Sequence, residues 1–367
     1  MVLAVVLAVT RVGGADEGVG EFDIPVVLPL TGAQVATLRG VAADLPEARG
    51  VIDEVAERAE RLRGMAPTPL RVIHYEGLVH TDPRRVATCR SLSQMGDVAW
   101  LVRDWQLTGD ERSAATLGRC VVAWSGAYVI TGNDVNENKL YPLLVAYEAL
   151  RPAFDDEDRA AVDRWVEELA LTHLERAQGA TRFSNRYVKR LRLLTVCARI
   201  LDCDDWLDEV VASVERFVVH GLRPDGTSYD LEERDTLTYH CSALRPPLEI
   251  AMLLGEGADD LYAWTSPEGA SIRKSVLYVL PYARGEKERR EWRHSRVRLD
   301  HERAAAGLPG YQPGMLYDPR SSLEMFEQAA YFEPAFDAVV ERLRGESAGV
   351  SWQTLMNRVV AQAREGN

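Results

Sequence analysis

The sequence predicts an all-α fold, an incomplete α/α toroid built from helical hairpins. Apolar residues recur at helical spacing from about residue 33 nearly to the end of the chain. Short turns containing Gly, Pro, Asp or Asn separate these stretches, and no strong strand pattern lies between them. Helices joined by short turns pack as antiparallel pairs, and a ring of such pairs suits their number.

Residues 1–32 are expected to form an N-terminal segment, followed by a single toroid domain over residues 33–367. The run MVLAVVLAVT is too short to span a membrane, which takes about 20 apolar residues. It also lacks the basic residues that precede the apolar part of a signal peptide. The segment is thus either signal-like or a short strand, and a cytoplasmic location is favoured over export.

The first predicted helices lie between residues 33 and 110. Residues 51–65 place apolar side chains at helical spacing and end at a Pro-rich break. Residues 81–110 begin with Thr-Asp-Pro, which predicts a capped helix with proline in its first turn, and the pattern ends at Gly109.

The later helices follow in the same way. They are predicted within residues 111–134, 135–154, 155–177, 185–201, 204–222, 231–257 and 266–286. The segment 285–320 is rich in Arg, Gly and Pro and predicts a long ordered loop or lid. A terminal helix pair is expected after it.

Composition excludes several classes of function. The net charge of -13 argues against nucleic acid as a partner. The five cysteines are scattered and show no metal-ligand spacing, so buried free thiols are expected. The seven histidines are dispersed, and neither a Gly-rich phosphate loop nor an HExxH motif is present. We therefore predict no metal, no cofactor and no membrane association; the oligomeric state is left open.

Residues 180–192 (ATRFSNRYVKRLR) concentrate positive charge in this acidic chain. They hold five of its 43 basic residues. Arg182, Arg186, Lys189 and Arg190 share one broad face of a helix. That face is either solvated or one wall of a cleft that binds an anion.

A second informative segment is DGTSYDLEERDTLTYHCSALRPPLEI, residues 225–250. It contains Arg234, Tyr239 and His240. One interpretation is structural: Tyr239 is a core residue with a hydrogen-bonded hydroxyl, and Arg234 pairs with a carboxylate. The other interpretation is a functional site.

Three segments in order resemble the alginate lyase family of polysaccharide lyases. Residues 76–151 contain TDPR, WQLTGD and TGNDVNE; residues 224–248 contain a DG…R…YH…AL…PL pattern; residues 264–288 form the third segment. The resemblance spans roughly residues 70 to 290. It implies a helical toroid and an enzyme that cleaves an anionic polysaccharide.

The resemblance also implies site residues. In the family an Asn-Asn-His triplet and a later Arg and Tyr surround the sugar that is cleaved. Asn185 corresponds to the second Asn, Tyr239 to the Tyr and Arg234 to the Arg. The triplet itself is altered, because this chain reads Ser184-Asn185-Arg186 and so carries arginine in place of histidine.

These residue types suit a β-elimination on a uronate. Amide and guanidinium groups spread the charge that develops on the carboxylate, and a tyrosine takes the C5 proton and returns a proton to O4. Arginine cannot act as a base, so we expect the protein to handle only the epimer that Tyr239 serves. The alternative is a repurposed toroid, which acts on another small carboxylated or natural-product substrate or binds a glycan without catalysis.

Five further residues are candidates for substrate binding: His240, Lys189, Asn136, His80 and Trp124. Asn136 also fits a helix cap, and Trp124 fits a core position. The basic stretch 286–298 either closes over an anionic chain or is a solvent-facing linker.

Overall fold

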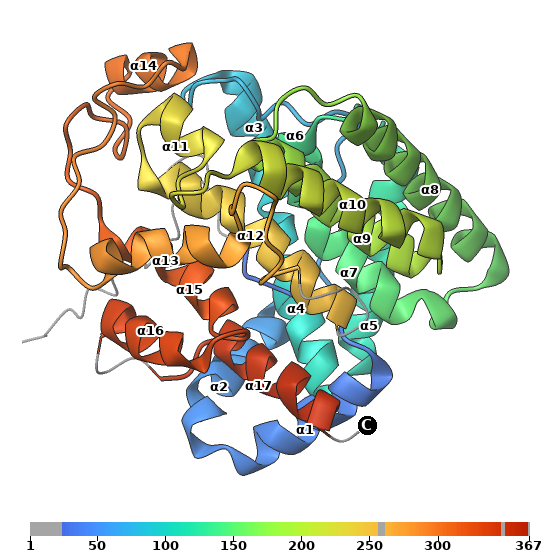
Figure 1. Cartoon of the computed structure of the whole chain (residues 1–367). Helices are drawn as coiled ribbons and strands as arrows, with labels where there is room; N and C mark the ends of the chain where they lie inside the picture. The colour runs from blue at the N-terminus through green and yellow to red at the C-terminus, as the bar shows by residue number, and fades with distance from the viewer. Residues whose placement is uncertain (1–23, 256–260, 346–348, 366–367) are drawn as a thin grey trace, which may run out of the picture.

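The computed structural model describes residues 24–255, 261–345 and 349–365, and this part of the chain is all-α, as predicted (Figure 1). Helices follow one another along the whole described chain, with isolated β-bridges at Leu222–Ser228 and Arg290–Leu316. The described helices are α1 (Gly32–Asp44), α2 (Arg49–Leu62), α3 (Pro83–Leu92), α4 (Gln94–Thr108), α5 (Glu111–Ala127), α6 (Asp134–Glu137), α7 (Tyr141–Leu150), α8 (Asp156–Gln178), α9 (Asn185–Ile200), α10 (Asp204–Gly221), α11 (Tyr229–Arg234), α12 (Leu237–Leu254), α13 (Ile272–Ala283), α14 (Arg298–Ala305), α15 (Leu323–Ala329), α16 (Asp337–Arg344) and α17 (Trp352–Glu365).

The helices form a toroid. Helices α4, α7, α9, α12 and α15 pack in that order, each against the next. Helices α5, α8, α10 and α13 pack on this inner series from outside. The first and last described helices meet, because α17 packs against both α15 and α1, and α1 packs against α4; α1 and α17 lie together at the bottom of Figure 1.

The helix signals in residues 81–110 are largely confirmed. Asp82 caps α3 and Pro83 begins it, while Gly109 ends α4 with a left-handed φ of 70°. The prediction of a single helix is wrong, however, because the helix is interrupted at Ser93, between α3 and α4. The Ser93 hydroxyl donates to the Arg90 carbonyl at 2.8 Å, a local bond that competes with the helical one.

Of the N-terminal segment expected over residues 1–32, residues 24–31 form neither helix nor strand, and Gly32 begins α1. Residues 24–31 pack into the domain, because Val27 and Leu28 are buried and Arg103 donates to the Val26 carbonyl at 3.0 Å. The expected signal-like or strand segment at residues 1–23 lies outside the described residues. Of the described helices, none is long and apolar enough to cross a membrane.

The five cysteines are free thiols, as predicted. Cys89, Cys120, Cys197 and Cys241 are buried, and Cys203 is half-buried. Burial raises the pKa of Cys120 to about 11, which keeps this thiol protonated and unreactive.

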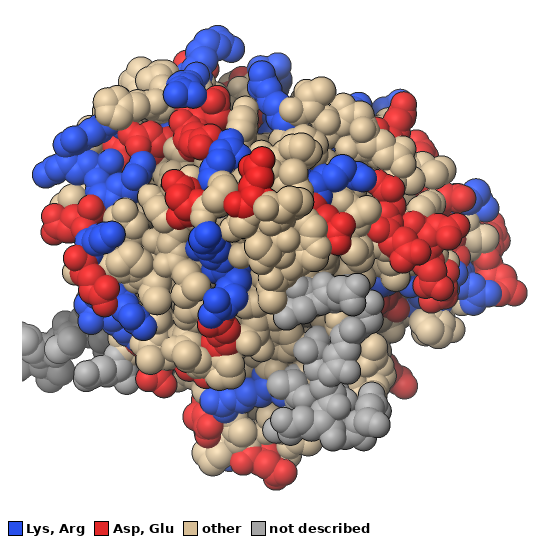
Figure 2. Space-filling view, in the orientation of Figure 1, with Lys and Arg blue, Asp and Glu red and all other residues tan. Residues whose placement is uncertain are grey.

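Charge is unevenly distributed on the surface. Figure 2 shows Asp and Glu gathered at the right, over α8, whose first turn alone contributes Asp156, Glu157 and Asp158. Lys and Arg gather at the upper left of the same view, over α14 and the chain before it. The acidic excess therefore does not extend over the segment 285–320.

Candidate active site

The site begins at the N-terminus of α9. Ser184 caps the helix by accepting from the Arg186 N–H at 3.3 Å. Asn185, the first helical residue, is 2% exposed, and its N–H donates to Asp230 Oδ2 at 2.7 Å. Its side-chain Nδ2 is buried and has no hydrogen-bond partner. An unused buried donor is costly in a folded protein, so this amide is a strong candidate to bind a ligand.

The basic face of α9 is only partly available to a ligand. Arg186 is half exposed, and its guanidinium contacts Asp134 at 2.9 Å and Glu76 at 3.0 Å. Arg190 also contacts Asp134, at 3.2 Å. The positive charge of Arg186 is therefore balanced within the protein by carboxylates that lie 52 and 110 residues away in sequence.

A buried network holds α9 against the TGNDVNE turn. Glu137 Oε1 accepts from the Thr131 and Gly132 N–H groups at 2.7 and 3.1 Å, and from the Tyr128 hydroxyl at 2.9 Å. Glu137 Oε2 lies 2.7 Å from His173 Nε2. His173 Nδ1 accepts from Arg190 Nη1 at 2.9 Å. Burial lowers the pKa of His173, so a neutral imidazole connects the turn to the basic face.

Tyr239 lies in the first turn of α12, which Thr236 caps. It is 4% exposed, and its hydroxyl is 3.2 Å from the Tyr311 hydroxyl. Arg303 Nη1 donates to both hydroxyls, at 3.1 Å to Tyr239 and 2.9 Å to Tyr311. The guanidinium of Arg234 lies over the Tyr239 ring, 3.8 Å from its centre. The phenol is thus surrounded by two arginines and a second tyrosine.

Asp300 organises the charges beside Tyr239. Its Oδ1 accepts from Arg234 at 2.8 Å, and its Oδ2 accepts from the Ser295 hydroxyl at 2.8 Å. Burial raises the pKa of Asp300, an effect that nearby Arg234 and Arg303 oppose. Arg234 therefore pairs with a carboxylate, as one interpretation of the sequence expected, while also contacting the tyrosine ring.

The Asn185 and Tyr239 regions are joined through α11. Asp230, which accepts from the Asn185 N–H, and Arg234, which covers the Tyr239 ring, are four residues apart on this helix. Residues at this spacing lie on the same face of a helix. Helix α12 also packs along α9. The predicted pair Asn185 and Tyr239 therefore belongs to one connected region.

Part of the segment 285–320 covers Tyr239, although much of the basic stretch 286–298 is exposed to solvent. Trp292, Leu308 and Tyr311 form a buried apolar cluster with Tyr239. The indole Nε1 of Trp292 is buried without a hydrogen-bond partner, and its backbone has a positive φ of 62°. Such a conformation is strained for a bulky residue.

Asp235, at the end of α11, attaches this segment to the domain. Its carboxylate accepts from Arg289 Nη2 at 2.5 Å and from the His294 N–H at 3.0 Å, and its carbonyl accepts from the Trp292 N–H at 2.9 Å. Glu291 in turn accepts from the Leu237 N–H at 2.5 Å, at the start of α12. Asp235 and Leu237, which lie on either side of the cap at the start of α12, are therefore both bonded to the segment 285–320.

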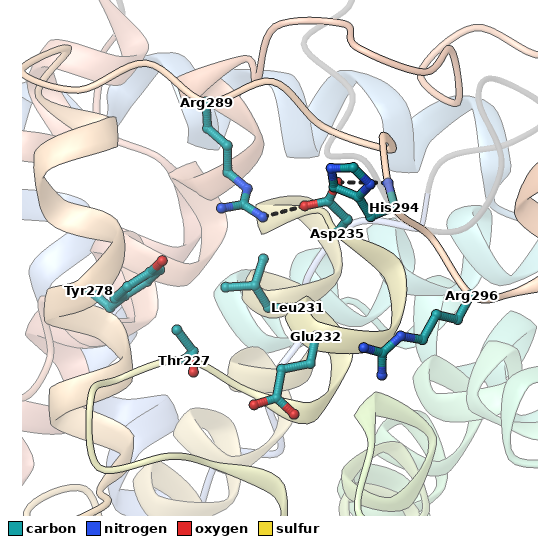
Figure 3. A pocket seen from close by; sticks show the side chains of 8 residues that line it. All are labelled: Thr227, Leu231, Glu232, Asp235, Tyr278, Arg289, His294 and Arg296. Atoms are coloured by element: carbon teal, nitrogen blue, oxygen red, sulfur yellow. Dashed lines mark hydrogen bonds and ion pairs between the residues drawn. The ribbon is translucent and has the colours of Figure 1, made fainter.

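A pocket of about 280 Å³ opens beside these contacts (Figure 3). In Figure 3 Arg289 points toward Asp235, and Tyr278 faces them from α13. The lining residues are Thr227, Leu231, Glu232, Asp235, Tyr278, Arg289, His294 and Arg296. Arg289, His294 and Arg296 of this lining belong to the basic stretch 286–298, whereas Glu232 and Asp235 are acidic. Tyr239, Asn185 and the other individually predicted site residues do not line this pocket.

Three predicted substrate-binding residues are structural instead. His240 is fully buried, with Nδ1 2.8 Å from Ser228 Oγ and Nε2 3.1 Å from the Ser275 carbonyl. Trp124 is a core residue whose indole donates to Gln94 at 2.8 Å. Asn136 is buried and bonds the backbone of Ile73 and Glu76. Their polar atoms bond to the protein interior, which gives these three residues structural roles.

For Lys189 and His80, the other two candidates, substrate binding stays a prediction. Lys189 is almost buried on α9, next to the basic face. His80 is half-buried in the chain that leads to α3. Sequence reasoning missed Arg303, Tyr311, Trp292 and Asp300. Its one signal for them was the unusual composition of the segment 285–320.

Metal binding gains no candidate from the structure. In the described part of the chain, no group of three or more His, Cys, Asp or Glu side chains is arranged to hold an ion.

The sequence model of the alginate lyase family matches residues 42–289. The chain belongs to the alginate lyase family. It is therefore a polysaccharide lyase, of a family whose members act on anionic polysaccharides. No match is found among curated protein sequences.

Solved structures agree in fold. An alginate lyase from Bacteroides ovatus is 14% identical with a TM-score of 0.63, over 92% of this chain and 99% of that one. The ligand-free histidine-to-alanine variant of alginate lyase A1-III is 17% identical with a TM-score of 0.52, over 78% and 91%. The same variant complexed with a tetrasaccharide is 18% identical with a TM-score of 0.50, over 73% and 91%. At these identities the likeness concerns the fold, and it confirms the predicted α/α toroid.

Proposed function

We propose that this alginate lyase family member cleaves a uronic-acid-containing, alginate-like glycan by β-elimination, with Tyr239 as both general base and general acid. The observation that carries the proposal is the setting of the Tyr239 hydroxyl, which accepts from Arg303 at 3.1 Å while Arg234 covers the ring. Nearby positive charge favours the ionised form of an acid. A phenol in this setting is suited to lose its proton, and the resulting phenolate can accept the proton from C5.

The proposed reaction needs no metal, and Tyr239 ends it in the same protonation state in which it began. The Tyr239 phenolate takes the proton from C5, the C5–H electron pair forms the C4–C5 double bond, and the C4–O4 bond breaks. The phenol then gives its proton to O4 of the departing sugar. General acid–base assistance supplies about 10²–10⁴ in rate, so neutralisation of the carboxylate has to supply much of the rest.

Asn185, Arg234 and Arg186 are proposed to neutralise that carboxylate. The unpartnered Nδ2 of Asn185 is a donor ready for a carboxylate oxygen. Arg234 brings positive charge next to the phenol. Arg186 assists, and a substrate carboxylate that reaches it would compete with Glu76, the more exposed of its two partners.

The test is an ultraviolet absorbance assay, because each elimination creates a conjugated double bond that the substrate lacks. Purified protein is incubated with polymannuronate, polyguluronate, mixed alginate, glucuronan and hyaluronan. We expect a rise on one uronate polymer. Tyr239→Phe should lower that rate by at least about 10²-fold and leave binding largely intact.

The matched control is Tyr229→Phe, which removes a half-buried hydroxyl from the neighbouring helix α11. It should keep the wild-type rate. Substantial turnover by Tyr239→Phe would refute the assignment of the base. A folded wild-type protein that is inactive on every polymer would instead favour the repurposed toroid, in which Arg186 in place of histidine accompanies a different ligand.

A further inference from the structure

Two groups that are able to donate a hydrogen bond converge on the Tyr239 oxygen. Arg303 Nη1 lies 3.1 Å away and can only donate, because a guanidinium has no acceptor. The Tyr311 hydroxyl lies 3.2 Å away and can donate or accept. When Tyr239 is ionised, both neighbours donate to it, and the negative oxygen is stabilised by two bonds. The arrangement therefore fits a phenolate at least as well as a phenol.

Arg303 and Arg234 contact Tyr239 in different ways. Arg234 lies against the ring face and pairs with Asp300 at 2.8 Å. Arg303 is 6% exposed and aims its Nη1 at the oxygen itself. A hydrogen bond to the ionised form of a group stabilises that form directly. Of these two arginines, Arg303 is thus the one placed to control the ionisation.

Arg303 lies outside the part of the chain that matches the family model, which ends at residue 289. It is in α14, within the segment 285–320 that covers Tyr239. Tyr311 comes from the same segment and lies beneath the Arg303 guanidinium, 5.0 Å from ring centre to carbon. The segment therefore supplies both of these groups, Arg303 and Tyr311, to the Tyr239 hydroxyl.

We propose that Arg303 is a positioning residue that holds Tyr239 in its ionised, proton-accepting form, with Tyr311 as the second donor. This role rests on the proposed function of Tyr239 as base. It assigns the segment 285–320 a part in the chemistry, beyond that of a cover over the substrate.

The first experiment is the pH dependence of kcat/KM on the active polymer. In Arg303→Met, which keeps the length but not the charge, the acid limb of the profile should move up by about one pH unit, which is about a tenfold loss at a pH on that limb. Arg303→Lys keeps a charge and should recover part of the shift. Tyr311→Phe keeps the ring but not the donor, and it should move the limb less, in the same direction.

The control is Arg298→Met in the same helix, whose side chain is 89% exposed and pairs with Glu302. It should leave the profile unchanged. A purely structural role for Arg303 predicts a different result: Arg303→Met would lower the rate equally at every pH. That outcome overturns the proposal, as does an unshifted profile.

A second measurement does not need turnover. Tyrosinate absorbs in the near ultraviolet, and the difference between proteins with and without Tyr239→Phe isolates the ionisation of Tyr239. This signal should appear at a lower pH when Arg303 is present than when Arg303→Met has been introduced, with circular dichroism confirming that each variant is folded. An identical titration refutes the role of Arg303 even in an active enzyme. Inactivity on every polymer with a shifted titration refutes only the proposed function.

Discussion

His240 should make the stability of this protein depend on pH. The imidazole is fully buried, and its Nε2–H donates to the Ser275 carbonyl while Nδ1 accepts from the Ser228 hydroxyl. A carbonyl can only accept, so Nε2 carries a proton, and in the neutral ring Nδ1 is left to accept from the Ser228 hydroxyl. Burial lowers the pKa of His240 from 6.5 to about 4. Through these two bonds His240, in α12, connects that helix to Ser228 before α11 and to Ser275 in α13.

The sign follows from which state binds the proton. As pH falls below 6.5 the unfolded chain takes up a proton at His240, but the folded protein does not until about pH 4. The stability is therefore fully present above pH 6.5 and is lost on going down to pH 4. A shift of this size corresponds to about 3 kcal/mol, because one pKa unit is about 1.4 kcal/mol.

The assay is urea unfolding, followed by circular dichroism, of wild type and His240→Gln between pH 8 and pH 4.5. At pH 8 the variant should be less stable by about 1–3 kcal/mol, since it loses one buried hydrogen bond and leaves a partner unsatisfied. That gap should shrink by about 2–3 kcal/mol at pH 4.5. His74→Gln, at an exposed position, is the control and should follow wild type. A gap that stays constant over this range would refute the reasoning.

Two further predictions concern the packing around the site. Glu291 should make stability change with pH in the opposite direction to His240. Burial raises the pKa of Glu291 from 4.5 to about 7. The stability that it contributes below pH 4.5 is therefore lost as pH rises through 7, by about 3 kcal/mol. Glu291→Gln should abolish this loss in urea unfolding at pH 5 and pH 8, and an equal decline in both proteins would contradict it. Gly132→Ala should cost at least about 2 kcal/mol, because φ is 69° and the new methyl would overlap Arg176 and lie 2.8 Å from Thr172 Cγ2. Thermal melts measure the cost. Gly126→Ala in α5, where a methyl meets nothing within 4 Å, should be neutral or stabilising in these melts, and a similar loss at both glycines would count against the steric explanation.

The helices were predictable because their signals are local. The Asp82–Pro83 start and the Gly109 end need only the residues beside them. The break at Ser93 was missed because the apolar periodicity continues through it, while the hydroxyl bond that interrupts the helix leaves no trace in that pattern. The toroid followed from the succession of hairpins.

The site was predictable only in part, because its contacts join distant residues. Asn185 and Tyr239 were identified by resemblance, and the structure places both in one connected region. The partners of Arg186 were invisible, since Glu76 is 110 residues away. His240 was expected to face the substrate, yet its neighbour Tyr239 turns toward Arg303 while His240 turns inward. Adjacent helix positions diverge, so only one of the two can line the site.

The charge around Tyr239 and Asn185 is almost entirely guanidinium, and this has a chemical consequence. The sequence holds only four lysines, Lys139, Lys189, Lys274 and Lys287, against 39 arginines. Lys189 is nearly buried, whereas Lys274 and Lys287 are exposed. Amine-directed reagents will therefore couple this protein to a solid support through its outer surface and leave the arginines beside Tyr239 unmodified. Because guanidinium groups stay protonated at any ordinary pH, the positive charge of an immobilised preparation will also persist well into alkaline solution.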